Sequence, residues 1–206
     1  EPETEMVRRN LQILRETGGN LHFCHISRKE SMQLIIKAKA EGLKVTVEVT
    51  PHHLFSHGLD YRVNPPIASE EDVKFLIESI KNGDVDVIGT DHAPHTEADK
   101  ANGAPGIINI ETAYAMIRKV FRENNISMKT LAKLMSNNPS FMTGTDSHIR
   151  EGSEANLVIL SDEAWKIDST KFVTRSRNTP YDGWEVVGKV EYTIAKGEIV
   201  YDNAGA

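Results

Sequence analysis

The chain has 206 residues, of which 39% are hydrophobic and 26% are charged, and its formal net charge at pH 7 is -6. This composition fits a soluble globular protein with a core of its own, and the absence of a Lys/Arg cluster argues against binding to nucleic acid. No apolar run reaches the roughly 20 residues that cross a bilayer, so no membrane partner is expected. The single cysteine, Cys24, excludes an internal disulfide and favours a reducing, cytoplasmic setting.

The first three quarters of the chain alternate between helical and strand patterns. Apolar residues at helical spacing predict a helix over residues 3–17, which Gly18-Gly19 ends. In chain order the pattern then predicts a strand at 21–26, a helix at 27–42, a strand at 45–49, a helix at 69–82, a strand at 85–90 and a helix at 110–123. Strands that alternate with helices predict parallel βαβ units.

Two of these helices have sequence signals for their first turn. Ser27-Arg28-Lys29-Glu30 has the form of a capping box, in which a serine and a glutamate satisfy backbone N–H groups of the first turn. Ser69 is placed to cap the later helix. We expect both serines to begin helices.

The last quarter has a different pattern. Residues 156–160 and 190–201 resemble strands, and Lys196-Gly197 predicts a hairpin turn within the second of them. The change predicts a boundary at residue 150, with a small β appendage after it.

Five of the eight histidines stand where predicted strands end: His25, His52, His53, His92 and His95, with Asp91 beside the last two. Ligands of parallel α/β proteins bind at the carboxyl ends of the strands. Imidazoles and a carboxylate gathered there suit a divalent metal such as zinc. Taken singly, each of these histidines could equally be a hydrogen-bonded loop residue.

Asp91 is the most informative of these positions because it follows the predicted strand at 85–90 directly. A carboxylate that emerges from a buried strand needs a metal or a proton to offset the cost of burial. The alternative is a helix N-cap, but Pro94 and the run Gly103-Ala104-Pro105-Gly106 favour a loop.

Several motifs carry a resemblance to a known family. Thr90-Asp91-His92-Ala93-Pro94-His95 resembles the hallmark hexapeptide of dihydroorotases. Further segments resemble dihydroorotase motifs in the expected order, at residues 21–27, 49–54, 63–66, 105–107, 111–112, 138–139, 155–159 and 179–184. The resemblance covers the whole chain, which is expected to correspond to about the second half of a family member.

The resemblance implies a fold. Dihydroorotases belong to the amidohydrolase superfamily, whose α/β fold is a TIM-like (β/α)8 barrel with a small β domain. By this similarity, residues 1–150 are the C-terminal part of the barrel and contain its strands six to eight. Residues 151–206 are then part of the β domain, and the missing N-terminal half of the barrel would be a partner of this chain.

The resemblance also implies roles for individual residues. His25 matches the metal ligand of strand six, and Asp91 matches the strand-eight ligand that is also the general acid/base. Asn64, His95 and the backbone of Pro105-Gly106 match positions that hold dihydroorotate.

Other residues of the same motifs receive lesser roles. Cys24 and Glu48 are expected to surround the ligands, with a further metal ion there as an open alternative. His22 is expected to pack within the fold. His52 and His53 are expected to be loop residues and not metal ligands.

The implied activity is the reversible hydrolysis of dihydroorotate to N-carbamoyl-aspartate in pyrimidine biosynthesis. Zinc, with two ions in the complete site, would activate water, and Asp91 would pass a proton to the departing ring nitrogen. The implied partners are these two metabolites, further copies of the protein in a homo-oligomer, and aspartate carbamoyltransferase.

Two departures from the family pattern leave alternatives open. Ile67-Ala68 stand where the family has Leu-Arg, and the sequence contains no His-x-His pair, which the family places in its first half. A metal held by His25 and Asp91 alone lacks the three protein ligands of catalytic zinc. The alternatives are another cyclic amidase, such as a hydantoinase, dihydropyrimidinase or allantoinase, and a non-catalytic partner of aspartate carbamoyltransferase.

Overall fold

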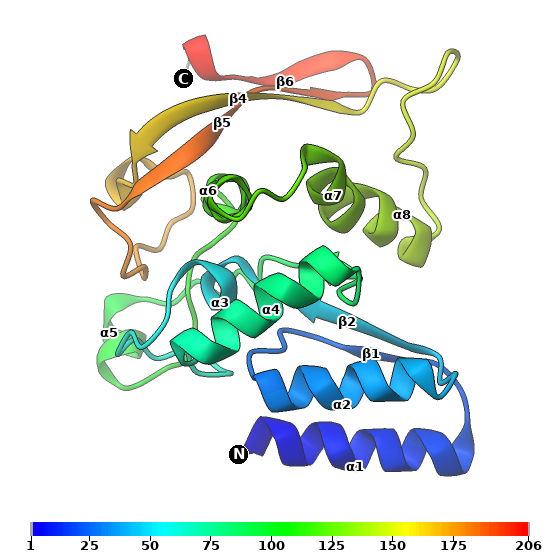
Figure 1. Cartoon of the computed structure of the whole chain (residues 1–206). Helices are drawn as coiled ribbons and strands as arrows, with labels where there is room; N and C mark the ends of the chain where they lie inside the picture. Colours follow the sequence, from blue (N-terminus) through cyan, green and yellow to red (C-terminus); the bar gives the residue numbers. More distant parts are fainter. Residues whose placement is uncertain (1, 206) are drawn as a thin grey trace. The chain divides into compact units, whose positions relative to one another are not determined.

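The computed structural model describes residues 2–205, which form two compact units (Figure 1). The first unit consists of Glu1–Ile110 and Ser169–Pro180, and the second of Glu111–Asp168 and Tyr181–Ala206. These units divide the chain at different positions from the domain boundary predicted at residue 150. That boundary concerns the domains of a complete protein and stays a prediction.

The first unit is built on a parallel sheet in the order β1-β2-β3. Its strands are β1 (Leu21–Phe23), β2 (Val45–Val49) and β3 (Val87–Ile88). β2 is the central strand and alternates buried with half-buried residues, and all three of its valines face the core. The predicted parallel βαβ arrangement is therefore confirmed.

Two of the strands are shorter than predicted. β1 ends at Phe23 because the chain leaves the extended conformation at His25, whose φ is 43°, before Ile26 N donates to Glu48 O. Just before β3, Asp86 bonds to Val47 through both its backbone and its side chain. Asp86 N donates to Val47 O at 3.0 Å, and Val47 N donates to the Asp86 carboxylate at 2.7 Å. Lys39 Nζ also binds this carboxylate, at 2.5 Å.

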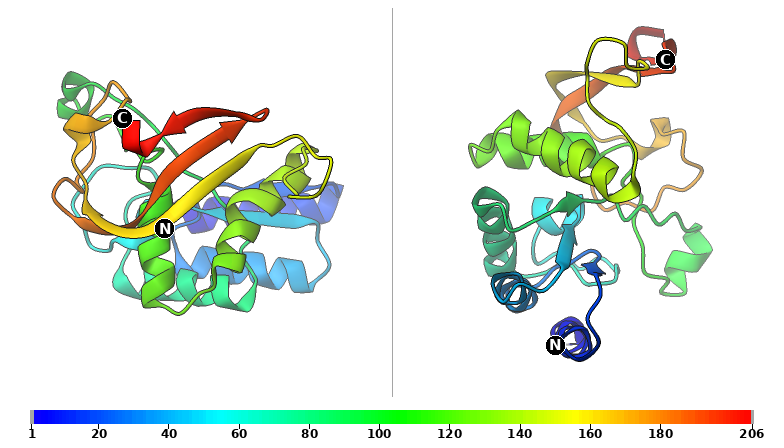
Figure 2. Two further views of the ribbon diagram at one scale, coloured as in Figure 1. Left: turned by 90° about the horizontal axis from the view of Figure 1, so that it is seen from above. Right: turned by 90° about the vertical axis from the view of Figure 1, so that its right-hand side faces the viewer.

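Five helices accompany the sheet. They are α1 (Pro2–Thr17), α2 (Lys29–Ala40), α3 (Pro51–Phe55), α4 (Glu70–Asn82) and α5 (Glu97–Ala101). α1 and α2 lie side by side (Figure 2), with Val7, Leu11 and Leu14 of α1 buried. A short 3-10 turn, Ser169–Lys171, also belongs to this unit.

The predicted starts of two helices have different outcomes. Ser69 caps α4 in a capping box with Asp72, as predicted. The capping box predicted for α2 is wrong, because Ser27 Oγ donates to Glu3 at 2.6 Å and the helix begins at Lys29 without a side-chain cap from Arg28. The backbone N of Lys29 donates instead to Asp72, at 2.8 Å.

The second unit combines helices with an antiparallel sheet. Its helices are α6 (Ala113–Glu123), α7 (Met128–Ala132) and α8 (Asn138–Thr143), with a π-helical segment at Lys133–Asn137. Its strands are β4 (Leu157–Lys166), β5 (Glu185–Ala195) and β6 (Glu198–Asp202), in that order, and a 3-10 turn follows at Asn203–Gly205. α6 packs against β5, where Gly188 leaves room for the ring of Tyr114.

The predicted hairpin is confirmed. Lys196 and Gly197 join β5 to β6 and have φ values of 52° and 83°. Positive φ at both central residues is the geometry that matches the twist of two antiparallel strands. No helix among residues 2–205 is long and apolar enough to cross a membrane.

Asp72 joins the starts of two helices, and this leads to a prediction about stability. Burial would raise the pKa of Asp72, but hydrogen bonds from Ser69 and Lys29 and the charge of Arg28 outweigh it, so the pKa is lowered. We expect Asp72→Ala to reduce the free energy of unfolding by about 1–2 kcal/mol. The measurement is urea denaturation of the complete protein.

The pH dependence and a control make this prediction specific. A lowered folded-state pKa stabilises fully above the unfolded pKa, and the contribution is lost as the pH falls through the folded value. The difference between Asp72→Ala and the native protein should therefore vanish in acid. Glu71→Ala removes an exposed carboxylate from the same turn, and its effect should stay within about 0.5 kcal/mol. Equal effects of the two variants would contradict the role of Asp72.

Candidate active site

The candidate site lies at the carboxyl ends of the parallel strands, within the first unit. His25 follows β1 by two residues, α3 with His52 and His53 begins two residues after β2, and Asp91 follows β3 by three residues. Because all three strands are parallel, their carboxyl ends share one edge of the sheet. The structure thus brings the predicted metal ligands to the same edge.

His25 and Asp91 share an unusual backbone conformation. Their φ values are 43° and 46°, in the left-handed region, which residues other than glycine seldom adopt. Such strain is held in place by the surrounding structure and is concentrated at functional sites. Asp91 is no helix N-cap, since it lies in a loop, as predicted.

Glu48 supports His25 from the central strand. Its carboxylate accepts from the backbone N of His25 at 3.2 Å. The same carboxylate fills the space beside Gly89, where an added Cβ would lie 2.3 Å from Glu48 Oε2. Only glycine leaves room for this carboxylate between β1 and β3.

The ionisation of the site follows from burial. Burial raises the pKa of Asp91, while the charge of His25 acts in the opposite direction. The pKa of the Cys24 thiol is also raised, by burial and then by the charges of Glu48 and Asp91. A carboxyl group whose pKa is raised holds its proton more strongly than a free carboxyl group does.

His52 and His53 are not loop residues, and that prediction is corrected here. Both lie in helix α3 and neither has exposed surface. Burial is the main cause that lowers the pKa of His52 to about 2 and that of His53 to about 4, so both rings are neutral. Pro51 at the first helical position favours this helix, a signal present in the sequence.

The two rings belong to one buried chain of hydrogen bonds. Asn109 Nδ2 donates to Thr90 O at 3.0 Å and lies 2.7 Å from His52 Nδ1, so His52 accepts at Nδ1 and carries its proton on Nε2. His52 Nε2 lies 3.3 Å from Thr50 Oγ1, which is 2.8 Å from His53 Nδ1. Their ring nitrogens thus bond within the protein, which favours a structural role over metal ligation.

The far end of this series of hydrogen bonds reaches a second loop. His53 Nε2 donates to Pro65 O at 3.0 Å. At the near end, His52 Nε2 lies 3.9 Å from Asp91 Oδ2, which is no ion pair because the ring is neutral. This series of hydrogen bonds therefore fixes the positions of the Asp91 loop and of the Asn64-Pro65 loop relative to β2.

The predicted substrate-binding residues are brought together on neighbouring loops. Asn64 is exposed and, with Pro105, lines one depression. Gly106 N donates to Arg62 O at 3.1 Å, which joins the two loops. Gly106 has a φ of 150°, and an added Cβ would lie 2.6 Å from the His95 ring. The ring of His95 can therefore pack only against a glycine.

Sequence reasoning missed two residues that hold these loops. Asn178 accepts from His95 N at 3.2 Å and donates to Ala93 O and Gly106 O at 3.0 and 3.2 Å. Asn109 connects His52 to the strand end, as described above. Neither asparagine has a sequence signal of its own, although Asn178 directly precedes a segment that resembles a family motif.

His92 is held in a structural role. Its Nδ1 accepts from the backbone N of Asn109 and of Ile110, at 3.1 and 3.2 Å. Helix α6 begins at Ala113 and not at the predicted residue 110. His22 similarly bonds within the sheet, to Thr46 Oγ1 at 2.8 Å.

The donor groups fit part of a divalent-metal site. His25 Nδ1 is buried, and no group among residues 2–205 hydrogen-bonds to it. Asp91 supplies a carboxylate at the same sheet edge. No three His, Cys, Asp or Glu side chains of the described chain are grouped to hold a metal ion. Catalytic zinc takes three protein ligands, so these residues supply an incomplete set.

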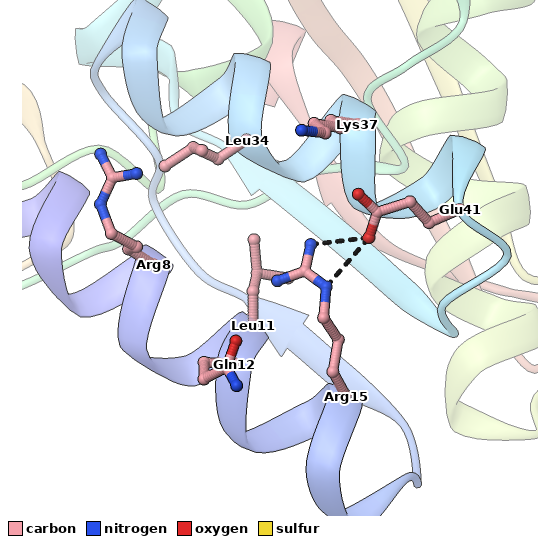
Figure 3. Close-up of a pocket in the computed structure, with 7 residues that line it drawn as sticks. All are labelled: Arg8, Leu11, Gln12, Arg15, Leu34, Lys37 and Glu41. Carbon is pink, nitrogen blue, oxygen red and sulfur yellow. Dashed lines mark hydrogen bonds and ion pairs between the residues drawn. The ribbon is translucent and has the colours of Figure 1, made fainter.

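The hollow between α1 and α2 is separate from this site. Figure 3 shows its lining, in which Arg15 Nη2 binds Glu41 Oε2 at 2.7 Å. None of the predicted metal or substrate residues lines it.

Ala68, which stands where the family has arginine, is buried and leaves no charge at that position.

Comparisons with known proteins extend the similarity over almost the whole chain. The model of the amidohydrolase family matches residues 32–201. The dihydroorotase of Clostridium botulinum is 46% identical over 97% of this chain and 51% of its own length. The dihydroorotase of Caldanaerobacter subterraneus is 42% identical over 98% of this chain and 50% of its own length.

Solved structures agree with this result. The L-hydantoinase (dihydropyrimidinase) of Arthrobacter aurescens is 28% identical, with a TM-score of 0.90 over 97% of this chain and 48% of its own. The dihydropyrimidinase of Brevibacillus agri is 22% identical, with the same TM-score and the same coverage of both chains, and shows the fold alone. The chain spans about half the length of the curated relatives it matches.

The contact between Glu48 and Gly89 leads to a second prediction. We expect Gly89→Ala to displace the Glu48 carboxylate and to destabilise the complete protein by about 1–3 kcal/mol, the range for overpacking. The backbone of Gly89 is not in the left-handed region, so alanine adds no strain of its own. Denaturation midpoints measure the effect.

A double variant separates the clash from other effects. Glu48→Ala removes the obstructing carboxylate, so adding Gly89→Ala to it should cost much less than in the native background. The coupling should exceed about 0.5 kcal/mol. Additive effects of the two substitutions would show that the contact does not require glycine.

Proposed function

The chain belongs to the amidohydrolase family, and we propose on that premise that the complete protein is a dihydroorotase. The observation that carries this proposal is the convergence of His25 with Asp91 and the His95 loop at one sheet edge. Asp91 and His95 belong to the hexapeptide that resembles the dihydroorotase hallmark. The greater identity to dihydroorotases than to the hydantoinase supports this activity over that of another cyclic amidase.

The proposed fold of the complete protein is a TIM-like barrel. β1, β2 and β3 would be its strands six to eight, and residues 151–206 part of a small β domain. Within the described chain β1 and β3 each pair only with β2, so the outer edges of both strands can accept the strands of another half. Unpaired strand edges of this kind require a partner.

His25 and Asp91 would hold a divalent metal, zinc in this proposal, with the remaining ligands and a second ion in the other half. The buried, unbonded Nδ1 of His25 and the half-buried carboxyl of Asp91 fit this role. When bound, the metal supplies Lewis acidity that makes water a stronger acid.

Asp91 has the chemistry of the proton carrier. Water adds to the amide carbonyl of the dihydroorotate ring, the carbon–nitrogen bond breaks, and Asp91 moves the proton of the water to the departing nitrogen. The product is N-carbamoyl-aspartate, and the reverse sequence closes the ring. Burial raises the pKa of Asp91 above the usual value of a carboxyl group, which is the direction that a general acid requires.

The loops hold the substrate in position for this transfer. Asn64, the His95 ring and the backbone of Pro105-Gly106 would supply hydrogen bonds to the ring and its carboxylate. In support, Asn64 and Pro105 line one depression, and the His95 ring packs against Gly106. Placing the reacting groups in this way accounts for a large part of an enzyme's rate. The neutral His52, fixed by Asn109, supports Asp91 without adding a charge.

The setting of the enzyme is part of the proposal. The complete protein would act in the cytoplasm in pyrimidine biosynthesis, as a homo-oligomer or together with aspartate carbamoyltransferase. A non-catalytic partner of that enzyme is the alternative from another class. Joint presence of His25, Asp91, Asn64 and His95 favours an active site.

Replacing Asp91 tests the mechanism. In the complete protein, Asp91→Asn should reduce turnover of dihydroorotate by at least about a hundredfold, the lower range for a general acid/base group. The denaturation midpoint should change little, since the amide has the shape of the carboxyl group. The control is His22→Gln, which lies in the sheet and should keep near-normal turnover. Normal turnover in Asp91→Asn would remove this residue from the mechanism.

The choice of substrate tests the activity itself. The complete protein should open dihydroorotate far faster than dihydrouracil, which lacks the ring carboxylate. A site built to pair a buried charge is left unsatisfied by an uncharged analogue, and the discrimination reaches about 10⁴-fold in comparable sites. The measurement is kcat/KM for both rings. Equal values would favour a dihydropyrimidinase.

A further inference from the structure

We propose that Lys100 is a positioning residue whose ammonium joins two substrate loops, residues 61–66 and residues 104–106. The inference rests on the proposed function, since it assumes that these loops hold dihydroorotate. Lys100 belongs to no motif that resembles the family, and it touches neither Asp91 nor His25. Its place in the structure nevertheless connects Asn64 with Gly106.

The three N–H donors of the Lys100 ammonium are all accounted for. Nζ donates to Arg62 O at 2.8 Å, to Ala104 O at 3.0 Å and to Gly106 O at 3.0 Å. One carbonyl comes from the first loop and two come from the second. An ammonium group has three donors and no acceptor, so a single side chain closes the gap between the loops.

An aromatic ring completes the surroundings of this ammonium. Nζ lies 4.3 Å from the centre of the Tyr61 ring, within the range of a cation–π contact. Burial raises the pKa of Tyr61 to about 12, so the phenol stays neutral. Within the part of the chain described, no carboxylate forms an ion pair with Lys100, whereas surface lysines such as Lys74 and Lys81 have one. Carbonyl dipoles and a ring take the place of a counter-charge.

The stem of Lys100 is fixed at its other end. It lies in α5, where Thr96 and Asp99 form a capping box and Lys100 N donates to Thr96 O at 3.0 Å. A side chain that begins in a capped turn loses less freedom when its head is bound. Lys100 is therefore restrained both at its backbone, within α5, and at its ammonium group.

The two loops depend on this group for more than one contact. Gly106 N donates to Arg62 O, and Asn178 Nδ2 donates to Gly106 O. Lys100 binds the same two carbonyl oxygens. Without it, Ala104 O loses its donor and the carbonyl dipoles of Arg62 and Gly106 repel each other, so the loops should separate. Asn64 and the His95–Gly106 contact would then move apart.

The test compares Lys100→Met with Lys100→Arg in the complete, metal-loaded protein. Met keeps the length and apolar stem but has no donor, and the planar guanidinium of Arg cannot direct its donors at three carbonyls as an ammonium does. We expect KM for dihydroorotate to rise about tenfold or more in both variants, the loss of one charge-assisted hydrogen bond or more. Turnover at saturation and metal content should change little.

The matched control is Lys74→Met. Lys74 is an exposed lysine of α4 that pairs with Glu70, so the variant makes the same change of charge away from the loops. Its KM should equal that of the native protein. Lys100→Ala adds a rescue experiment, because propylamine has the size and charge of the part removed. Propylamine should restore KM in this variant, and 1-propanol, which has no positive charge, should not.

A second measurement does not depend on activity. Hydrogen exchange at residues 104–107 should be faster in Lys100→Met than in the native protein and in Lys74→Met, because the amide of Gly106 bonds across the joint. A change in the denaturation midpoint with unchanged KM and unchanged exchange would overturn the proposal and leave Lys100 a stabilising residue. A native protein that does not open dihydroorotate would refute the proposed function, and exchange alone would then decide whether Lys100 joins the loops.

Discussion

Parallel pairing of β2 with a strand on each side is the constraint on which the site depends. It brings the carboxyl ends of β1 and β3 to one edge, so that His25 and Asp91 lie at the same edge although they are 66 residues apart. Glu48 of β2 then bonds to His25, and Gly89 leaves the space that its carboxylate needs. A larger residue at position 89 would act on both flanking strands at once.

Around this edge, neutral polar groups hold the loops in place. His52 and His53 are uncharged because they are buried, and as neutral rings they can accept a hydrogen bond at one nitrogen and donate at the other. Asn178, which is also neutral, bonds to the loop that follows Asp91. The ammonium of Lys100 is the charged exception and bonds to carbonyl groups of residues 62, 104 and 106. The buried rings of His52 and His53 are thus satisfied by partners within the protein, whereas the buried Nδ1 of His25 has none among the described residues.

The proposed metal site has fewer ligands than catalytic zinc takes, in agreement with the share of its relatives that the chain spans. The chain spans about half of the dihydroorotases it resembles, and its described residues offer His25 and Asp91 but no third metal ligand grouped with them. The outer edges of β1 and β3 also lack partner strands, because each of these strands pairs only with β2 in the described chain. In the proposal, the other half of the barrel would supply both the further metal ligands and the partner strands.

The sequence by itself determined the order of elements in the first unit and the residues at the strand ends. Apolar periodicity and caps placed α1, β2 and α4, because local spacing governs which face of a helix or strand is buried. The motif around Asp91 pointed to the family and to its substrate loops. Only the tertiary structure decided that α2 begins without its expected cap and that His52 lies in a buried helix. It also brought Asn109 to His52, Asn178 to Ala93 and Gly106, and Lys100 to Arg62. These partners are far away in the sequence, and no local pattern records such contacts.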